Sequence, residues 1–220
     1  MRFKAAIFDM DGTLLESMHI WQNLAPDFLK RHNIFPEKDF AIQTSVPSIR
    51  GAVRYMIEKF DMDVDEDHEV EKIYTELRTF YNRQVTVKPG VPELLEALHS
   101  AGIVSGVVTA TESDLAAAAL EYTGLKKYFH DRILSGAELN LSKSTPKPFQ
   151  MMCDILGSAP EETIVFEDAL YAAKCAADAG YHVAAVYDSS EPQQVELQQL
   201  AVWYCRHWNE FPLHIFQNLP

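Results

Sequence analysis

Two aspartates one residue apart, Asp9 and Asp11, follow a short apolar segment near the start of the 220-residue chain. Residues i and i+2 at the end of a strand point to the same side, so both carboxylates would face one ligand. Two carboxylates held together repel each other unless a cation or a shared proton offsets their charge. The pair therefore indicates a divalent metal site, an acid–base pair or both. Alternatively, the Asp11-Gly12 dipeptide simply forms a turn, in which this pair of residues is common.

Three later segments carry polar groups that could join this pair. Thr109 ends an apolar run, and the backbone N–H groups that lead from it into a helix could bind an anion; alternatively, Ser113 simply caps that helix. Lys143 precedes two prolines and could neutralise a phosphate, or be a surface lysine before a helix. Glu167 and Asp168 end a buried run, where their hard oxygen ligands suit Mg²⁺.

Continuous apolar runs predict the strands that would position these groups, because strands buried on both faces of a parallel sheet are apolar throughout. The predicted strands are residues 5–8, 103–108, 164–166 and 183–187. Helical spacing at 92–99 and 114–122 alternates with them and predicts an α/β fold, a doubly wound, Rossmann-like and mostly parallel sheet. An edge strand at 202–205 and a short helix from Glu210 are expected near the C-terminal end. Ligands gather at the carboxyl ends of such strands, so the polar groups should meet there.

Residues 17–85 differ from the rest because helical periodicity continues throughout them. Their apolar residues predict the buried stripes of three or four helices. We therefore expect an all-helical unit at 17–85, inserted into a core formed by residues 1–16 and 86–220. The acidic run at 61–67 lacks the glycine and final glutamate of an EF-hand loop, so we interpret it as a solvated turn and helix start.

Composition and charge exclude several functions. Lys and Arg number 19 against 32 Asp and Glu, a net charge of −13, so nucleic acid is a poor partner. A hydrophobic content of 47% with 23% charged residues is typical of a globular protein. No apolar run reaches the ~18 residues of a membrane span, and charge interrupts the start too early for a secretory signal, so we expect no membrane partner and a cytoplasmic location. Cys153, Cys175 and Cys205 lack metal or redox spacing and should be reduced core residues.

Taken in their order along the chain, the four polar motifs resemble the four motifs of the haloacid dehalogenase (HAD) superfamily. The helical insertion after the first motif resembles the C1 cap of that superfamily. The motifs are Asp9 to Thr13, the strand ending at Thr109, Lys143, and Glu167-Asp168. The resemblance covers nearly the whole chain. The segment Lys88-Pro89-Gly90-Val91 makes the subfamily of small-molecule phosphatases and β-phosphoglucomutase-like enzymes the most similar one.

The resemblance implies that Asp9 is the nucleophile and Asp11 the general acid and base. A carboxylate is a weak nucleophile that in-line positioning and nearby cations make useful. The phosphoryl group would be held by Thr109, Ala110 and Lys143. Mg²⁺ would be bound by Asp9, Asp168 and the backbone carbonyl of Asp11. Glu167 would assist from the outer coordination shell of the metal or through a water molecule.

The implied function is a Mg²⁺-dependent phosphatase that hydrolyses a small phosphorylated metabolite through an aspartyl-phosphate. Substrate choice should lie in the cap, which closes over the site and excludes water. Candidate contacts are His19, Trp21, Ser45, Ser48 and Arg50, each of which could instead pack the cap or face solvent. We expect a monomer or weak dimer.

Other functions use related residues. A phosphosugar mutase needs a second, cationic phosphate site, for which Arg50, Arg54 or Lys59 are candidates; Thr13 and the lack of a paired basic cluster favour hydrolysis. A dehalogenase has no second acid at the position of Asp11. A phospho-acceptor signalling receiver has its acidic pair ahead of an acceptor on a later strand, and a non-catalytic binding module does not need the full set of acids.

Overall fold

Buried apolar segments form a six-stranded sheet in the computed structural model, which describes residues 3–35 and 48–213. The strands are β1 (Ala5–Phe8), β2 (Val104–Thr109), β3 (Ile133–Ser135), β4 (Thr163–Glu167), β5 (His182–Val186) and β6 (Trp203–Cys205). Their order is β3-β2-β1-β4-β5-β6, and every pair of neighbours is parallel. The predicted doubly wound sheet is confirmed, and β1 lies at its centre with all four residues buried.

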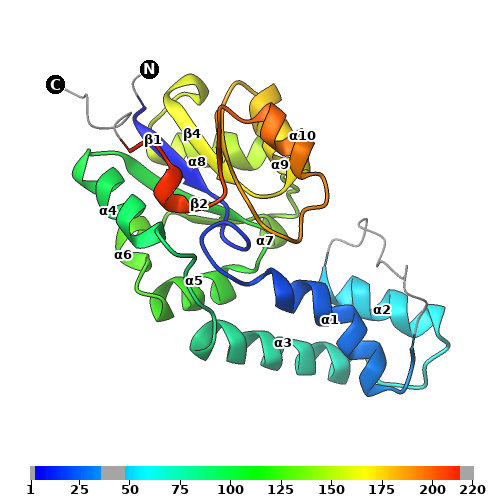
Figure 1. The fold of residues 1–220 in the computed structure, drawn as a ribbon. Helices are drawn as coiled ribbons and strands as arrows, with labels where there is room; N and C mark the ends of the chain where they lie inside the picture. The colour runs from blue at the N-terminus through cyan, green and yellow to red at the C-terminus, as the bar shows by residue number, and fades with distance from the viewer. Residues whose placement is uncertain (1–2, 36–47, 214–220) are drawn as a thin grey trace.

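Helices cover both faces of the sheet, as Figure 1 shows. They are α4 (Val91–Ser100), α5 (Ser113–Tyr122), α6 (Lys126–Phe129), α7 (Gly136–Leu139), α8 (Lys147–Leu156), α9 (Leu170–Asp178) and α10 (Gln194–Leu200), with 3-10 turns at Pro160–Glu162 and Trp208–Glu210. Successive residues of β1 point to opposite faces. Phe8 therefore packs in one core with α4, α5 and α6, whereas Ile7 packs in the other with α8, α9 and α10.

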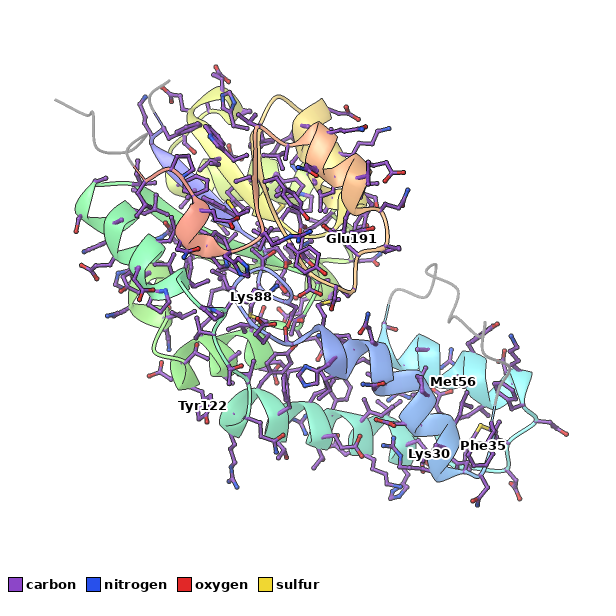
Figure 2. The ribbon with its side chains drawn as sticks, in the orientation of Figure 1. Lys30, Phe35, Met56, Lys88, Tyr122 and Glu191 are labelled. Atoms are coloured by element: carbon purple, nitrogen blue, oxygen red, sulfur yellow. The ribbon has the colours of Figure 1, made fainter. Side chains whose placement is uncertain are left out.

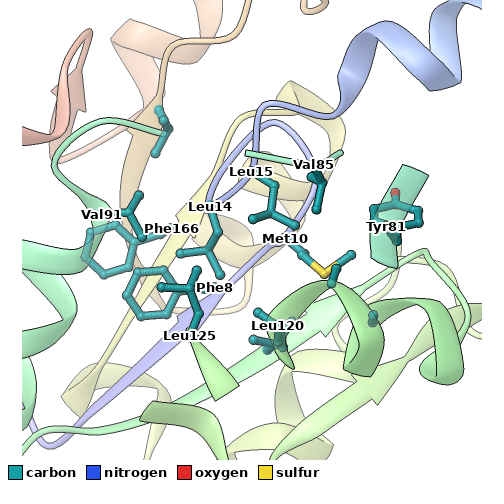
Figure 3. Packing of buried hydrophobic residues seen from close by; sticks show 14 of the residues in the cluster. Phe8, Met10, Leu14, Leu15, Tyr81, Val85, Val91, Leu120, Leu125 and Phe166 are labelled. Carbon is teal, nitrogen blue, oxygen red and sulfur yellow. The ribbon is translucent and has the colours of Figure 1, made fainter. Parts of the chain in front are cut away.

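Aromatic stacking joins the two central strands on the first of these faces. Phe8 and Phe166 lie face to face with ring centroids 4.4 Å apart, and Leu14 and Val91 lie close by (Figure 3). Trp208 packs against both rings. Trp208 lies in a 3-10 turn of which Glu210 is the last residue, so the expected helix does not begin at Glu210. The rest of that predicted helix, beyond residue 213, lies outside the described residues.

Residues 17–85 contribute three described helices, α1 (Met18–Arg31), α2 (Ile49–Lys59) and α3 (Glu66–Arg83), which extend from the sheet core as an arm (Figure 1). Each buries one apolar stripe, as the periodicity predicts. The acidic run before α3 is a turn and helix start, because the Asp65 carboxylate accepts a hydrogen bond from the His68 N–H. The division into a core and a separate helical domain stays a prediction.

The arm is tied to the core at its base. The chain leaves and returns through paired segments, where the Glu16 N–H donates to the Thr86 carbonyl oxygen at 2.9 Å. Beside them, the Tyr122 hydroxyl at the end of α5 donates to the carbonyl of Arg83, the last residue of α3 (Figure 2). These bonds set the base of the arm beside the edge of the sheet at which the predicted site lies.

Two further expectations concern single residues. Ser113 does not cap α5; Glu112 occupies the cap position, and the Ser113 hydroxyl donates to Glu138 instead. All three cysteines are free thiols.

Among the described residues, no helix combines the length and the apolar character needed to cross a bilayer.

Candidate active site

The ends of three adjacent strands bring the predicted groups together. Asp9 directly follows β1, and its N–H donates to the Phe166 carbonyl of β4 at 2.9 Å. Because Phe8 pairs with Phe166, the next residues of the two strands, Asp9 and Glu167, lie side by side. On the other side of β1, β2 ends at Thr109. The parallel register therefore puts all three side chains at one edge of the sheet.

Three carboxylates form a buried cluster at this edge. One carboxylate oxygen each from Asp9, Glu167 and Asp168 lies within 4.8 Å of the others. The residues are only 7%, 0% and 4% exposed. Buried charges of one sign repel strongly and need a counter-charge, so the cluster calls for a cation.

Lys143 supplies part of that charge. Its Nζ donates to Asp9 Oδ1 at 2.6 Å and to Glu167 Oε1, and the lysine is 6% exposed. Burial by itself lowers the pKa of Lys143, but the carboxylates of Asp9 and Glu167 outweigh burial and hold that pKa well above its usual value. The lysine is therefore a permanent cation beside Asp9. The other oxygen of Glu167 accepts the Asp168 N–H, so both Glu167 oxygens are engaged.

The pKa values show that one lysine does not balance the cluster. Burial raises the pKa of Asp9 to about 6 although Lys143 opposes the shift. Burial, together with the charges of Asp9 and Glu167, also raises the pKa of Asp168 well above its usual value. A divalent cation would remove this penalty, and three clustered carboxylates are the hard oxygen donors that Mg²⁺ prefers. The residues present therefore fit Mg²⁺.

A tight loop after β1 wraps around Asp168. The Thr13 hydroxyl donates to Asp168 Oδ1 at 3.0 Å. Gly12 has a φ of +84°, and a Cβ at this position would lie 2.3 Å from Asp168 Oδ2. The turn therefore requires glycine, both for its left-handed backbone and for the space beside the carboxylate.

Asp11 has a different environment from Asp9. Three hydroxyl groups donate to its carboxylate, each at 2.6 Å: those of Ser17 and Tyr81 to Oδ1, and that of Thr111 to Oδ2. Burial and the neighbouring Asp9 raise the pKa of Asp11, and the three hydroxyls oppose the rise. Its side chain is thus held apart from the acidic cluster and remains able to exchange a proton.

The donors to Asp11 come from both parts of the chain. Tyr81 lies on α3, and its own oxygen accepts a hydrogen bond from Trp21 Nε1 on α1 at 2.9 Å. Burial and the charge of Asp11 raise the pKa of Tyr81, so its phenol stays protonated and donates. Helix α3 is therefore bonded directly to Asp11, and α1 is connected to it through Trp21 and the Tyr81 phenol.

Two adjoining cavities lie at this edge. The first, of about 220 Å³, contains Asp9, Asp11, Lys143 and Asp168 in its walls, together with Thr109 and Ala110. The second, of about 300 Å³, lies between α1, α2 and the loop after β2. Both are bordered by Trp21, Ala110 and Thr111, so one small ligand could occupy the two.

The structure brings some of the candidate specificity residues to these cavities and not others. Trp21 borders both and Ser48 borders the second. His19 lies outside the two walls, with its ring edge-on to Phe80 at 5.2 Å. Arg50 also lies outside, because its guanidinium pairs with Glu66 and Asp67. Ser45 is outside the described residues.

Several residues of the site had no role in the sequence interpretation: Ser17, Tyr81, Thr111, Glu112 and Tyr171. Thr111 had a detectable signal, because a second hydroxyl residue follows Thr109 at i+2. Tyr81 had none, since it is a buried aromatic residue of a helix like many others.

Comparison with known proteins adds an independent observation. The family model described as haloacid dehalogenase-like hydrolase matches residues 6–186. Hexitol phosphatase A of Escherichia coli is 28% identical over 190 residues, 84% of each chain. The N-acetylmuramic acid 6-phosphate phosphatase of Pseudomonas aeruginosa is 31% identical over 198 residues, 84% of this chain and 82% of that protein.

Solved structures share the fold. A HAD hydrolase from Entamoeba histolytica superposes with a TM-score of 0.79 at 21% identity, covering 99% of this chain and all of that one. A putative beta-phosphoglucomutase from Thermotoga maritima has a TM-score of 0.73 at 22% identity, with 98% and 97% of the chains covered.

Proposed function

The chain belongs to the haloacid dehalogenase-like hydrolases, and on this basis we propose that it is a Mg²⁺-dependent phosphatase that acts through an aspartyl-phosphate on Asp9. The observation that carries the proposal is the buried cluster of Asp9, Glu167 and Asp168, with the Lys143 amine 2.6 Å from Asp9. Asp9 is the nucleophile in this proposal because it belongs to the cluster, is bonded directly to the buried lysine and borders the first cavity at the end of β1. Glu167 shares the cluster, the lysine and the cavity, but it is fully buried and both of its oxygens are engaged by Lys143 and the Asp168 N–H.

The substrate binds with its phosphate in the first cavity. Lys143 and the backbone N–H groups around Thr109 and Ala110 hold the phosphoryl oxygens, while an oxygen of Asp9 attacks phosphorus opposite the ester oxygen. Mg²⁺, held by Asp9, Asp168 and the carbonyl of Asp11, would offset the negative charge of the phosphoryl group. The P–O ester bond breaks as the Asp9–phosphorus bond forms.

Asp11 acts as the general acid in the first half-reaction and as the general base in the second. Its raised pKa keeps a protonated fraction available, which donates to the departing ester oxygen. The resulting carboxylate then removes a proton from the water that attacks the aspartyl-phosphate, and inorganic phosphate leaves. The three hydroxyls keep the Asp11 side chain on the substrate side of the cluster during this exchange.

The helices α1–α3 act as a cap in this proposal. Trp21 and Ser48 border the cavities, and closure over the substrate would exclude water from the phosphoryl group. The curated relatives differ in the substrates that their names state, from hexitol and N-acetylmuramic acid phosphates to phosphoglycolate. The substrate class that we propose for this chain is therefore a small phosphorylated metabolite. The cytoplasmic location and the monomeric or weakly dimeric state stay predictions.

A phosphate-release screen over sugar phosphates, nucleotides and small phosphoesters tests the proposal. Wild-type protein should release phosphate with Mg²⁺ and stop reversibly when EDTA is added. Asp9→Asn should abolish release, while Asp27→Asn, a matched change of an exposed aspartate on α1, should not alter it. Release by Asp9→Asn, or full activity in excess EDTA, would contradict the proposal.

The same screen distinguishes a phosphatase from a phosphosugar mutase. Arg50 and Arg54 both pair with Glu66, which leaves their charge largely compensated and unsuited to a second phosphate. Release of phosphate without interconversion of β-glucose 1-phosphate and glucose 6-phosphate supports hydrolysis. A stable phosphoprotein without turnover would instead indicate a receiver.

A further inference from the structure

The second cavity lies where the rest of the substrate must go. A phosphate held against Asp9 and Lys143 lies in the first cavity, which shares Trp21, Ala110 and Thr111 with the second. The group attached to the ester oxygen therefore extends into the second cavity. At about 300 Å³, this cavity is at the small end of the ~300–1,000 Å³ range of ligand sites.

Most of the second cavity is apolar. Its apolar walls are formed by Trp21, Leu24, Ala25, Ile49, Ala52, Ala110, Leu115 and Ala137. Ser48, Thr111 and Glu112 are its polar residues, and among the described residues that border it there is no lysine, arginine or histidine. The Thr111 hydroxyl is already engaged by Asp11, and Ser48 Oγ accepts the Gly51 N–H. Of the described residues that border this cavity, Glu112 is thus the only charged one.

The Glu112 side chain has one oxygen that is bonded and one that is not, among the described residues. Its Oε1 accepts a hydrogen bond from the Tyr74 hydroxyl of α3, and among the described residues no hydrogen bond engages Oε2. Burial and the nearby Glu112 charge raise the pKa of Tyr74, so the phenol is the donor. Glu112 also occupies the N-cap position of α5, where the helix dipole favours a negative charge.

Basic side chains around the cavity are engaged by other acids. The charge of Glu112 helps to raise the pKa of Arg78 on α3, but the Arg78 guanidinium pairs with Glu71 at 2.7 Å. Arg50 follows Ile49 in α2, but its guanidinium is bound by Glu66 and Asp67. Lys143 lies in the wall of the other cavity and is bound by Asp9 and Glu167. A ligand group in the second cavity therefore meets a carboxylate acceptor within apolar walls.

We propose that Glu112 selects the substrate: the second cavity receives a leaving group that carries hydroxyl groups and no second negative charge. Hydroxyls of such a skeleton donate to Glu112 Oε2, and its C–H surface packs on Trp21 and the aliphatic walls. A carboxylate or second phosphate in the same place is repelled by Glu112 in a partly desolvated cavity. This inference rests on the proposed phosphatase activity and adds a substrate class to it.

Two substrates that differ in one group test the inference. Glucitol 6-phosphate and 6-phosphogluconate share a six-carbon chain and differ at C1, a hydroxymethyl in the first and a carboxylate in the second. The wild-type protein should show a kcat/KM at least about tenfold higher for glucitol 6-phosphate. Equal values, a preference for 6-phosphogluconate, or turnover of p-nitrophenyl phosphate without turnover of glucitol 6-phosphate would overturn the inference.

Variants assign the discrimination to Glu112. Glu112→Gln keeps an oxygen for Tyr74 and should reduce the ratio of the two kcat/KM values to about threefold or less. Glu112→Lys should raise kcat/KM for 6-phosphogluconate above that of the wild type. The control Glu121→Gln removes an equal charge from an exposed position of α5 and should leave the ratio unchanged. A wild-type ratio retained in both Glu112 variants would overturn the assignment.

The outcomes separate this inference from the proposed function. Failure of the wild type to release phosphate from any ester, p-nitrophenyl phosphate included, contradicts the phosphatase and the inference with it. Release from both six-carbon esters without discrimination contradicts the inference alone.

Discussion

The Tyr81 hydroxyl donates to Asp11 Oδ1 across 2.6 Å, although the two residues lie on different parts of the fold. Asp11 follows the central strand of the sheet, whereas Tyr81 is fully buried near the end of α3 and also accepts a hydrogen bond from Trp21. A movement of α3 relative to the sheet must change or break this contact, and α1 is linked to it through Trp21. In the proposed mechanism, Tyr81 therefore positions the group that moves the proton.

Tyr81→Phe tests this positioning role. The hydroxyl stabilises the Asp11 carboxylate, so its loss should raise the pKa of Asp11 further. An acid with a higher pKa stays protonated to higher pH, so the alkaline limb of kcat/KM should move upward, and kcat should fall roughly tenfold for the loss of a hydrogen bond to a charged group. Tyr122→Phe, which removes a different bond between α3 and α5, is the control. An unchanged pH profile in Tyr81→Phe would show that the hydroxyl is only structural.

Lys143→Met should destabilise the protein as well as inactivate it. The substitution leaves Asp9 and Glu167 buried without their cation, which typically costs ~3–5 kcal/mol. The loss should be largest in EDTA at pH 8 and smaller with saturating Mg²⁺. Urea unfolding of Lys143→Met beside Lys147→Met, an exposed lysine, measures the difference. Equal stability of the two variants would contradict the buried ion pairs.

The stability of metal-free protein should decrease as pH rises. The pKa of Asp9 is raised by burial from 3.8 to about 6, and that of Asp168 is raised too, so the folded state holds these protons more tightly than the unfolded chain does. The unfolding free energy in EDTA should therefore fall between pH 5 and pH 8, by ~1 kcal/mol from Asp9 alone. Lys143 keeps its proton in both states over this range and contributes no slope.

Magnesium should reverse this trend, because it binds the ionised carboxylates. The stabilisation by Mg²⁺ should thus grow from pH 5 to pH 8. Asp9→Asn, which has no titratable group at this position, should show a shallower slope in EDTA than the wild type. A flat profile for the wild type, or the same slope in the variant, would exclude Asp9 as the source.

Gly12→Ala should weaken metal binding through Asp168. The new Cβ would lie 2.3 Å from Asp168 Oδ2, so the carboxylate must move. We expect a half-saturating Mg²⁺ concentration at least about tenfold higher, a size typical of lost ligand support. Gly102→Ala is a matched control, because Gly102 also has a positive φ, +74°, but nothing lies within 4 Å of its Cβ position. If both variants need the same Mg²⁺ concentration, backbone strain rather than the Asp168 contact is responsible.

Much of the fold could be predicted from the sequence because its signals are local. A central parallel strand is a continuous apolar run, and the predicted strand at 5–8 coincides with β1. The acidic and hydroxyl residues that follow these runs mark the carboxyl ends of strands. By contrast, β3 was missed, since Ile133–Ser135 contains only two consecutive apolar residues.

The geometry of the site required the tertiary structure. The three hydroxyl donors of Asp11 lie 6, 70 and 100 residues further along the chain, and nothing around Tyr81 marks it as one of them. His19 and Arg50 were reasonable candidates by position, yet one packs on Phe80 and the other pairs with acids. Which face of a helix meets the site depends on how the helices pack together, and a sequence pattern specifies the buried stripe but not the neighbour that covers it.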